Sequence, residues 1–141
     1  MMQFDKELEE MHQNSFNIHR FTEKIGRKAT LSVMTISAIK QLGLDKEMKR
    51  LDWHRMTTFL SKIYEGYRRD VEYHNDLHAA DVMQMAFVML TEGNLIEKAE
   101  LQALDALAIL ISAVCHDFGH DGFNNGFHVN AVTDRAIRYS D

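Results

Sequence analysis

The sequence predicts an all-α protein, and three of its features support this prediction. Proline, which interrupts helices, is absent from the 141 residues, and glycine occurs only 7 times. Leucine, methionine, alanine, glutamate and lysine are frequent, and all of them favour helices. Apolar residues recur at spacings of three and four over long stretches, which is the period of an amphipathic helix. We therefore expect a helical bundle.

Turn-forming residues divide the chain into about five helical segments. The breaks fall at Gly43, at residues 70–75, at residues 93–94 and in a loop over residues 119–126. Before the first break, the pattern predicts a short helix over residues 5–12 and a single long helix over residues 22–42. Gly43 is well placed to end that long helix, because glycine readily adopts the left-handed conformation found there.

The helices after Gly43 differ in how much of their surface is apolar. Residues 52–68 carry one apolar stripe, whereas residues 76–91 are apolar nearly all round and predict a central, buried helix. Asn94 and Glu97 resemble a capping box that opens a helix running to Cys115. A final helix is expected to begin near Asn130.

Composition and charge exclude several classes of protein. The length suits one domain with a real core. The net charge of −5 argues against nucleic acid as a partner, because phosphate backbones require a basic face. The first residues lack the apolar core of a signal peptide, and no stretch has the length of a membrane span. The single cysteine, Cys115, excludes an internal disulfide. We expect a cytoplasmic protein without a nucleic-acid or membrane partner.

Two short stretches, residues 73–81 and 116–122, contain most of the chemically active side chains. Together they supply four histidines along with several aspartates, and these residue types bind divalent metals and transfer protons. His74, His78 and Asp81 have the spacing of one helical face. The apolar helix before His116 ends in adjacent imidazole and carboxylate groups, and a buried carboxylate is costly without a partner. The alternative is a set of unrelated structural histidines.

A metal site accounts for these residues as a group. His78, His116 and Asp117 would form a mixed nitrogen and oxygen shell suited to Zn or a similar ion. Asp117 could also bridge to a second, harder ion such as Mg, which would give a two-metal clamp on a phosphoryl group. His74 could act as a general acid for a leaving oxygen. His120 follows across a glycine turn that allows close folding around the site. The chain is therefore predicted to be a metal-assisted hydrolase.

At these residues the chain resembles the catalytic domain of class I 3′,5′-cyclic-nucleotide phosphodiesterases, a branch of the HD-domain metallohydrolases. The matching stretches are YHNDLHAADVMQ, residues 73–84, and HDFGHDGFNNGFHVN, residues 116–130. With the helical region upstream, the resemblance covers residues 20–141. It implies the N-terminal part of the family's helical fold, with residues 1–20 as a lead-in and residues 21–141 as part of a catalytic domain.

The resemblance also implies an activity and a role for each residue. The reaction would be hydrolysis of cAMP or cGMP to the 5′-monophosphate in signal transduction, with two divalent ions, Zn and Mg or Mn. His74 resembles the proton donor to the O3′ leaving group and contacts substrate. His78, His116 and Asp117 resemble ligands of the tighter metal, and Asp117 also contacts the second metal and substrate. His120 resembles the histidine outside the ligand set, near the bridging hydroxide.

The chain departs from the family pattern in three ways. Glu72 stands where the family usually has proline, and Asp121 stands where the family often has proline. The family pattern continues beyond Asp141 to a fourth ligand, an aspartate, and to a glutamine that grips the purine. We therefore expect this chain alone to hydrolyse cyclic nucleotides poorly unless Asp81 or Asp141 replaces that ligand, and to associate into homo-oligomers through exposed apolar surface. The alternatives are another HD-type nucleotide phosphohydrolase, or a non-catalytic truncated paralogue that binds a metal or a partner.

Overall fold

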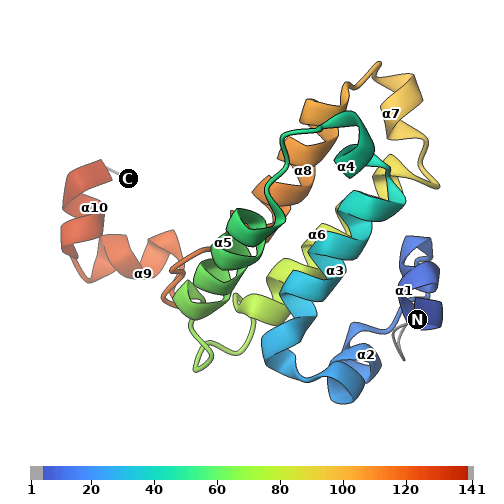
Figure 1. Ribbon diagram of the computed structural model, residues 1–141. Helices are drawn as coiled ribbons and strands as arrows, with labels where there is room; N and C mark the ends of the chain where they lie inside the picture. Colours follow the sequence, from blue (N-terminus) through green and yellow to red (C-terminus); the bar gives the residue numbers. More distant parts are fainter. Residues whose placement is uncertain (1–4, 140–141) are drawn as a thin grey trace.

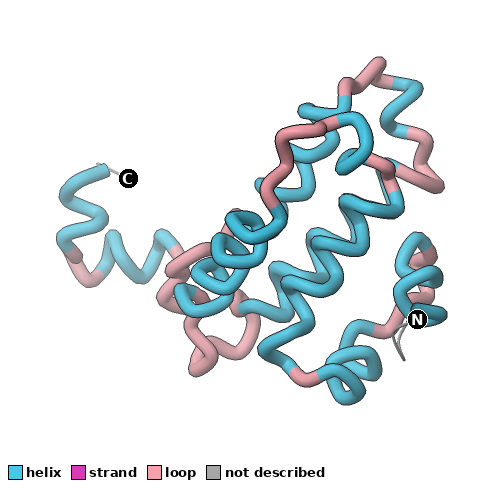
Figure 2. The backbone as a smooth tube through the Cα atoms, in the orientation of Figure 1, coloured by secondary structure: helices cyan, strands magenta, loops and turns pink. Residues whose placement is uncertain are grey.

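A computed structural model describes residues 5–139 as helices joined by loops (Figures 1 and 2). Between these residues no strand is present, which confirms the all-α prediction. In chain order the elements are α1 (Asp5–Glu9), the 3-10 helix η1 (Glu10–His12), α2 (Ile18–Ile25), α3 (Arg27–Gln41), α4 (Leu44–Glu47), α5 (Trp53–Gly66), α6 (Asp76–Leu90), α7 (Leu95–Lys98), α8 (Ala103–Cys115), α9 (Asn125–Asn130) and α10 (Asp134–Tyr139).

The core forms around α6, which lies between α3 and α8 and packs against both (Figure 1). Ala79, Ala80 and Met83 are fully buried, and Phe87 is 1% exposed. Burying each large apolar side chain contributes about 1.5–3 kcal/mol. The prediction of a central, buried helix over residues 76–91 is therefore confirmed.

The segment before α3 also packs against the core. Leu8, Met11 and Phe21 are buried, and the amide of Gln84 donates hydrogen bonds to the carbonyls of Met11 (2.7 Å) and Gln13 (3.0 Å). These bonds satisfy a buried amide and fasten η1 to α6. The predicted division between residues 20 and 21 stays a prediction.

The expected single helix over residues 22–42 is wrong, because the chain bends at Gly26. Gly26 has φ 86° and ψ 139°, so the helical hydrogen bonding of α2 stops there and α3 starts afresh at Arg27. The helical pattern also begins earlier than expected, since the Asn17 side chain caps α2 by accepting a hydrogen bond from the Arg20 N–H. The predicted stop at Gly43 is correct, with φ 70° and a hydrogen bond to the Lys40 carbonyl.

The predictions for residues 94–115 are correct only in part. The helix expected from residue 95 to Cys115 is divided, since α7 ends at Lys98 and a capping box of Gln102 and Asp105 opens α8. Asn94 is the N-cap residue of α7, as expected, but its side chain makes no capping hydrogen bond. Its φ is 53°, and its amide instead donates to the Glu97 carboxylate at 2.7 Å.

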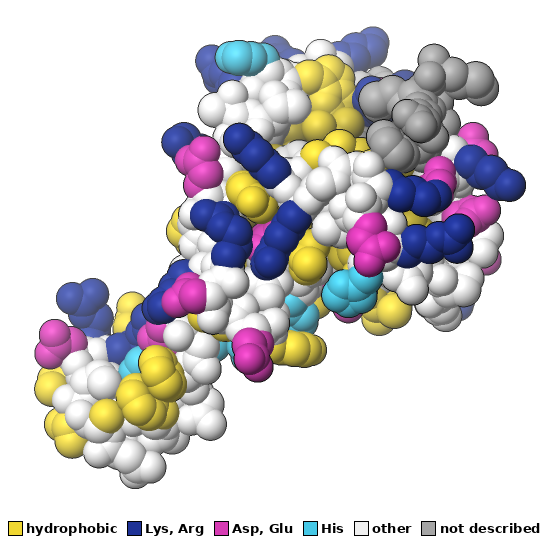
Figure 3. Space-filling model, turned by 90° about the horizontal axis from the view of Figure 1, so that it is seen from below, with side chains coloured by type: hydrophobic (Ala, Val, Ile, Leu, Met, Phe, Trp, Pro, Cys, Tyr) yellow, Lys and Arg dark blue, Asp and Glu magenta, His cyan; other side chains and the backbone are white. Residues whose placement is uncertain are grey.

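The last helical region begins at α9 and not near Asn130, because the Asn124 side chain accepts a hydrogen bond from the Phe127 N–H and starts the helix there. A break at residues 131–133 separates α9 from α10. The two short helices pack together and extend away from the bundle as an arm (Figures 1 and 3).

Large apolar side chains are exposed on the arm, and Figure 3 shows them on the projecting lobe. They are Phe123, Phe127, Val129, Val132, Ile137 and Tyr139. Met85, Met89 and Leu104 are exposed on α6 and α8. Association through apolar surface stays a prediction. None of the helices between residues 5 and 139 combines the length and apolar character of a bilayer crossing.

Candidate metal centre

The first loop of the site is organised by Asn75, a residue to which the sequence assigned no role. Its side-chain oxygen accepts hydrogen bonds from the N–H groups of Leu77 (3.0 Å) and His78 (3.3 Å), so it caps α6. Its amide donates to the carbonyls of Val71 (3.0 Å) and Glu72 (2.9 Å). Asn75 therefore binds both the loop before α6 and the first turn of the helix, and this orients His78 in that turn.

The second loop begins where α8 ends. His116 is the C-cap residue of α8, and its Nδ1 lies 2.8 Å from the Ala113 carbonyl. Because a carbonyl only accepts, His116 Nδ1 carries the proton and Nε2 keeps its lone pair. A hydrogen bond of this kind commonly fixes the tautomer of a metal-binding histidine.

Three side chains from these two loops meet at one point. His78 Nε2 lies 3.3 Å from His116 Nε2, and Asp117 Oδ2 lies 3.1 Å from His116 Nε2 and 3.5 Å from His78 Nε2. Donor atoms placed about 2.0–2.1 Å from one tetrahedral ion are separated from one another by about 3.3 Å. The three atoms therefore fit a single ion, and the predicted convergence of these residues is correct.

The electrostatics of the cluster also suit a cation. Burial, together with the neighbouring His116, lowers the pKa of His78, so its imidazole is neutral near pH 7 and offers a lone pair. The carboxylate of Asp117 and the lone pair of His116 point into the same space, which a positive ion stabilises. The side chains of His78, Asp117 and His116 are 16%, 18% and 34% exposed, so an ion can reach them from solvent.

His74 and His120 lie beside this cluster without joining it. Their rings stack at a centroid distance of 4.0 Å and an angle of 17°, and His74 meets His78 edge-on at 5.8 Å. His120 Nδ1 accepts the Gly122 N–H at 3.0 Å, which leaves His120 Nε2 as the proton-bearing nitrogen. Two imidazoles suited to proton transfer therefore flank the three donor atoms.

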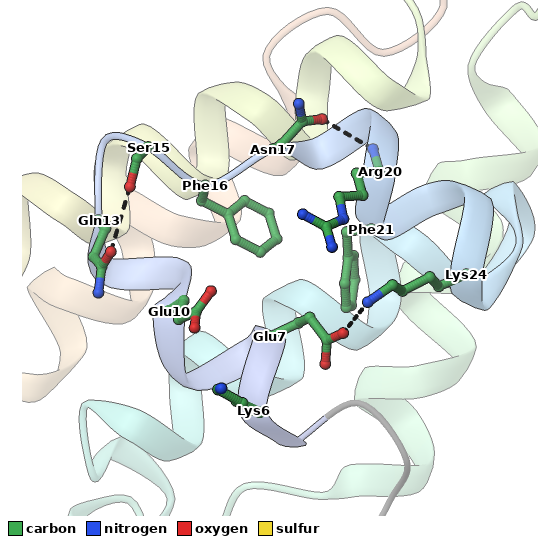
Figure 4. Close-up of a pocket in the computed structure, with 10 residues that line it drawn as sticks. All are labelled: Lys6, Glu7, Glu10, Gln13, Ser15, Phe16, Asn17, Arg20, Phe21 and Lys24. Atoms are coloured by element: carbon green, nitrogen blue, oxygen red, sulfur yellow. Dashed lines mark hydrogen bonds and ion pairs between the residues drawn. The ribbon is translucent and has the colours of Figure 1, made fainter.

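Asp81 is exposed and is not one of the three converging residues. It lines a groove of about 660 Å³ together with His78, Tyr73 and Arg27. Asp141 lies outside the described residues. A separate cavity of about 320 Å³ between α1, η1 and α2 is lined by charged side chains and two phenylalanines, and none of the residues of the metal centre borders it (Figure 4).

Several contacts that support the site were missed from the sequence. Arg27 binds the buried Asp76 carboxylate through two nitrogens, at 2.7 Å and 3.0 Å, and so ties α3 to the N-terminal end of α6. The Tyr67 hydroxyl contacts the backbone beside Asp117. These residues are far apart in sequence and belong to no local motif, so only the fold brings them together.

An ion pair also joins the second loop to the arm. Asp121 contacts His128 at 3.1 Å and Arg135 at 2.9 Å. A proline at position 121 could make neither contact.

Sequence comparisons identify known proteins that are similar to this chain. Residues 73–141 match the sequence profile of the 3′5′-cyclic nucleotide phosphodiesterase family. The chain is also 39% identical over 95 residues to the 3′,5′-cyclic-nucleotide phosphodiesterase regA of Dictyostelium discoideum, across 67% of this chain and 12% of the relative. The chain belongs to the cyclic nucleotide phosphodiesterase family.

Other phosphodiesterases give the same result. The chain is 30% identical over 139 residues to the 3′,5′-cyclic-AMP phosphodiesterase 4C of Mus musculus, across 99% of this chain and 20% of the relative. It is 37% identical over 83 residues to the high affinity cGMP-specific 3′,5′-cyclic phosphodiesterase 9A of Drosophila melanogaster, across 59% of this chain and 5% of the relative. The chain therefore spans a fifth or less of the length of these phosphodiesterases.

Proposed function

We propose that this chain contributes the metal centre and the proton donor for hydrolysis of 3′,5′-cyclic nucleotides, cAMP or cGMP, to 5′-nucleoside monophosphates in signal transduction. The observation that carries the proposal is the triangle of donor atoms from His78, His116 and Asp117, with sides of 3.1–3.5 Å. The membership of the phosphodiesterase family supports the choice of substrate.

In this proposal the three converging residues hold one divalent ion, Zn being the best match to two imidazoles and a carboxylate. Asp117 has a second carboxylate oxygen, which would contact a second ion, Mg or Mn. Bound ions would supply positive charge that stabilises the negative charge developing on the phosphate. The remaining chemistry belongs to the side chains.

The proposed reaction breaks the P–O3′ bond as a water oxygen bonds to phosphorus. His74 donates a proton to the departing O3′, because it lies next to His78 and outside the three donor atoms. His120, stacked on His74, limits the orientations that the His74 ring can adopt. One water proton leaves to solvent, and His74 regains a proton from solvent before the next turnover. The water oxygen stays on phosphorus, so each phosphodiester bond that breaks consumes one water.

We also propose that the residues from 21 onward form part of the catalytic domain, that the substrate is a cyclic nucleotide, and that the location is cytoplasmic. The relatives' names support the choice of substrate. The sequence left two alternatives open, another HD-type phosphohydrolase and a non-catalytic paralogue that binds a metal or a partner. The experiments below distinguish them from the proposed function.

The test separates metal binding from turnover. Purified wild-type chain and the variants His78→Ala, His116→Ala and Asp117→Ala are titrated with Zn²⁺ by calorimetry, with His54→Ala, an exposed histidine on α5, as the matched control. We expect wild type and the control to bind equally and each ligand variant to bind at least tenfold more weakly. Equal binding by all five proteins would contradict the assignment.

Turnover is then measured on the metal-loaded wild-type chain with cAMP and cGMP, using a metal-free sample as the blank. Formation of 5′-monophosphate above the blank supports the proposed reaction. Metal binding without product from either nucleotide is the result expected if the reaction needs the family's downstream ligand, and the same assay on a chain extended by that ligand then decides: product there supports the proposed reaction, and its absence there favours the non-catalytic alternative. Product from other nucleotide phosphates alone would favour a different HD-type enzyme.

A further inference from the structure

The hydroxyl of Tyr67 lies at the point where α8 ends and the metal-binding loop begins. Tyr67 follows the last residue of α5 and is 1% exposed. Its hydroxyl donates to the Val114 carbonyl at 3.0 Å and accepts the Asp117 N–H at 3.3 Å. Helix ends leave such backbone groups without helical partners, and a hydroxyl can satisfy a donor and an acceptor at once.

The same end of α5 contacts the residue after Asp117. A Cβ atom added to Gly66 would lie 2.0 Å from Phe118 Cε2, so the Phe118 ring packs directly against the Gly66 backbone. The Phe118 and Tyr67 rings also meet edge to face, at a centroid distance of 6.2 Å. The C-terminal end of α5 therefore contacts the chain before Asp117, at Asp117 itself and at the residue after it.

The position of this backbone decides where the Asp117 carboxylate lies. His116 has its own hydrogen bond to the Ala113 carbonyl, and His78 is oriented by the capped turn of α6. For Asp117, the N–H donates to the Tyr67 hydroxyl on the α5 side, and the carbonyl accepts the His120 N–H at 3.0 Å within its own loop, so the Tyr67 bond is the one that ties Asp117 to another part of the fold. A carboxylate displaced by about 1 Å would leave the range in which one ion can contact all three donors.

We propose that Tyr67 is a positioning residue for the metal centre: its hydroxyl holds the Asp117 backbone so that the carboxylate completes the set of donor atoms. The proposal rests on the proposed function of His78, His116 and Asp117 as metal ligands. It extends the site from two loops to a third element, α5, which contributes no ligand.

The experiment uses Co²⁺ as a probe, because its visible absorption reports the geometry and number of its ligands. Tyr67→Phe removes the hydroxyl and keeps the ring, and Tyr64→Phe makes the same change one turn earlier on α5. We expect Tyr67→Phe to bind Co²⁺ about 10–100-fold more weakly with a changed visible spectrum. Tyr64→Phe should match the wild type in both respects.

Thermal unfolding of the metal-free proteins separates positioning from simple stability. A Tyr67→Phe protein that unfolds at a lower temperature but keeps wild-type Co²⁺ affinity and spectrum would overturn the proposal. If wild-type chain itself binds no Co²⁺, the proposed function fails and this inference fails with it. If wild type binds and the variant binds identically, only this inference fails.

A second variant keeps the test decisive if Tyr67→Phe does not fold. Phe118→Ala removes the ring that packs on Gly66, and the fold should tolerate it because Phe118 is 52% exposed. We expect weaker Co²⁺ binding by about threefold or more, with Phe59→Ala, a similarly exposed residue of α5, as the control. Wild-type binding by Phe118→Ala in that case would overturn the proposal.

Discussion

At the scale of single residues, His74 differs from its neighbours because it is adjacent to the three donor atoms without sharing their point of convergence. In the proposed reaction His74 is the proton donor, so replacing it with alanine would remove that group and leave His78, His116 and Asp117 in place. In a chain extended by the family's downstream aspartate and purine pocket, we expect His74→Ala to retain its metal content while turnover of cAMP falls on the order of 10²–10⁴-fold relative to the same chain with His74. Metal analysis and product assays on the same sample check this. Loss of metal would make His74 a ligand.

Tyr67 gives a second residue-level prediction, through pH. Burial raises the pKa of Tyr67 to about 12, whereas an unfolded chain has a tyrosine pKa of about 10. Between these values the unfolded state has released the proton and the folded state keeps it, so stability falls as pH rises from about 10 to 12. The loss is at most about 2–3 kcal/mol.

Urea unfolding of wild type, Tyr67→Phe and Tyr64→Phe at about pH 9 and 12 measures this effect. The alkaline loss of stability should shrink in Tyr67→Phe and persist in Tyr64→Phe. An absorbance titration in which all 4 tyrosines ionise together near pH 10 would contradict the prediction.

At the scale of secondary-structure elements, the bend at Gly26 defines where α3 begins and so where Arg27 meets Asp76. The φ of 86° disfavours any residue with a Cβ, although the space around Gly26 is open. We expect Gly26→Ala to lower the free energy of unfolding by about 1–3 kcal/mol through backbone strain alone. Gly126→Ala, within the helix α9, should be neutral or stabilising. Urea unfolding of both variants makes the comparison, and equal stabilities would refute it.

The arm of α9 and α10 depends on Asp121. The Phe123 N–H, Arg135 and His128 hold the pKa of Asp121 below its ordinary value despite the opposing effect of partial burial. The contribution of Asp121 to stability is therefore present above about pH 4 and is lost as pH falls through its lowered pKa.

Asp121→Asn removes the charge of this ion pair. We expect amide hydrogen exchange in α9 and α10 to rise by about tenfold, while Zn²⁺ binding stays unchanged. Glu23→Gln, which neutralises an exposed carboxylate on α2, serves as the control. Unchanged exchange in the arm of Asp121→Asn would show that other contacts hold it.

At the scale of the whole molecule, a bound ion would connect the start of α6 to the end of α8, the two helices whose packing forms much of the core. An ion that binds only the folded chain stabilises it by about 2.7 kcal/mol at 100 times its dissociation constant. This corresponds to a rise in unfolding temperature of roughly 5–10 °C. Thermal unfolding with Zn²⁺, and after chelation, measures the shift. His78→Ala, which should bind the ion at least tenfold more weakly, should show a shift of about half this size or less, and a shift of equal size in that variant would place the ion elsewhere.

The sequence by itself determined the helical class, the buried character of α6 and the identity of the converging residues. These features depend on local periodicity and on side-chain chemistry, which are readable without a fold. Helix boundaries were less predictable, because the bend at Gly26 and the caps at Gln102 and Asn124 depend on backbone conformation and individual hydrogen bonds rather than on apolar period.

Only the tertiary structure decided how the site is assembled. His78 and His116 are separated by 38 residues, and Tyr67 and Asp117 by 50. Contacts over such distances arise because α6 packs between α3 and α8 and because α5 ends beside the loop that follows α8. The converging residues belong to motifs that the sequence displays. Tyr67, which contacts the backbone of one of them, follows a separate helix, and only the packing of the core brings it there.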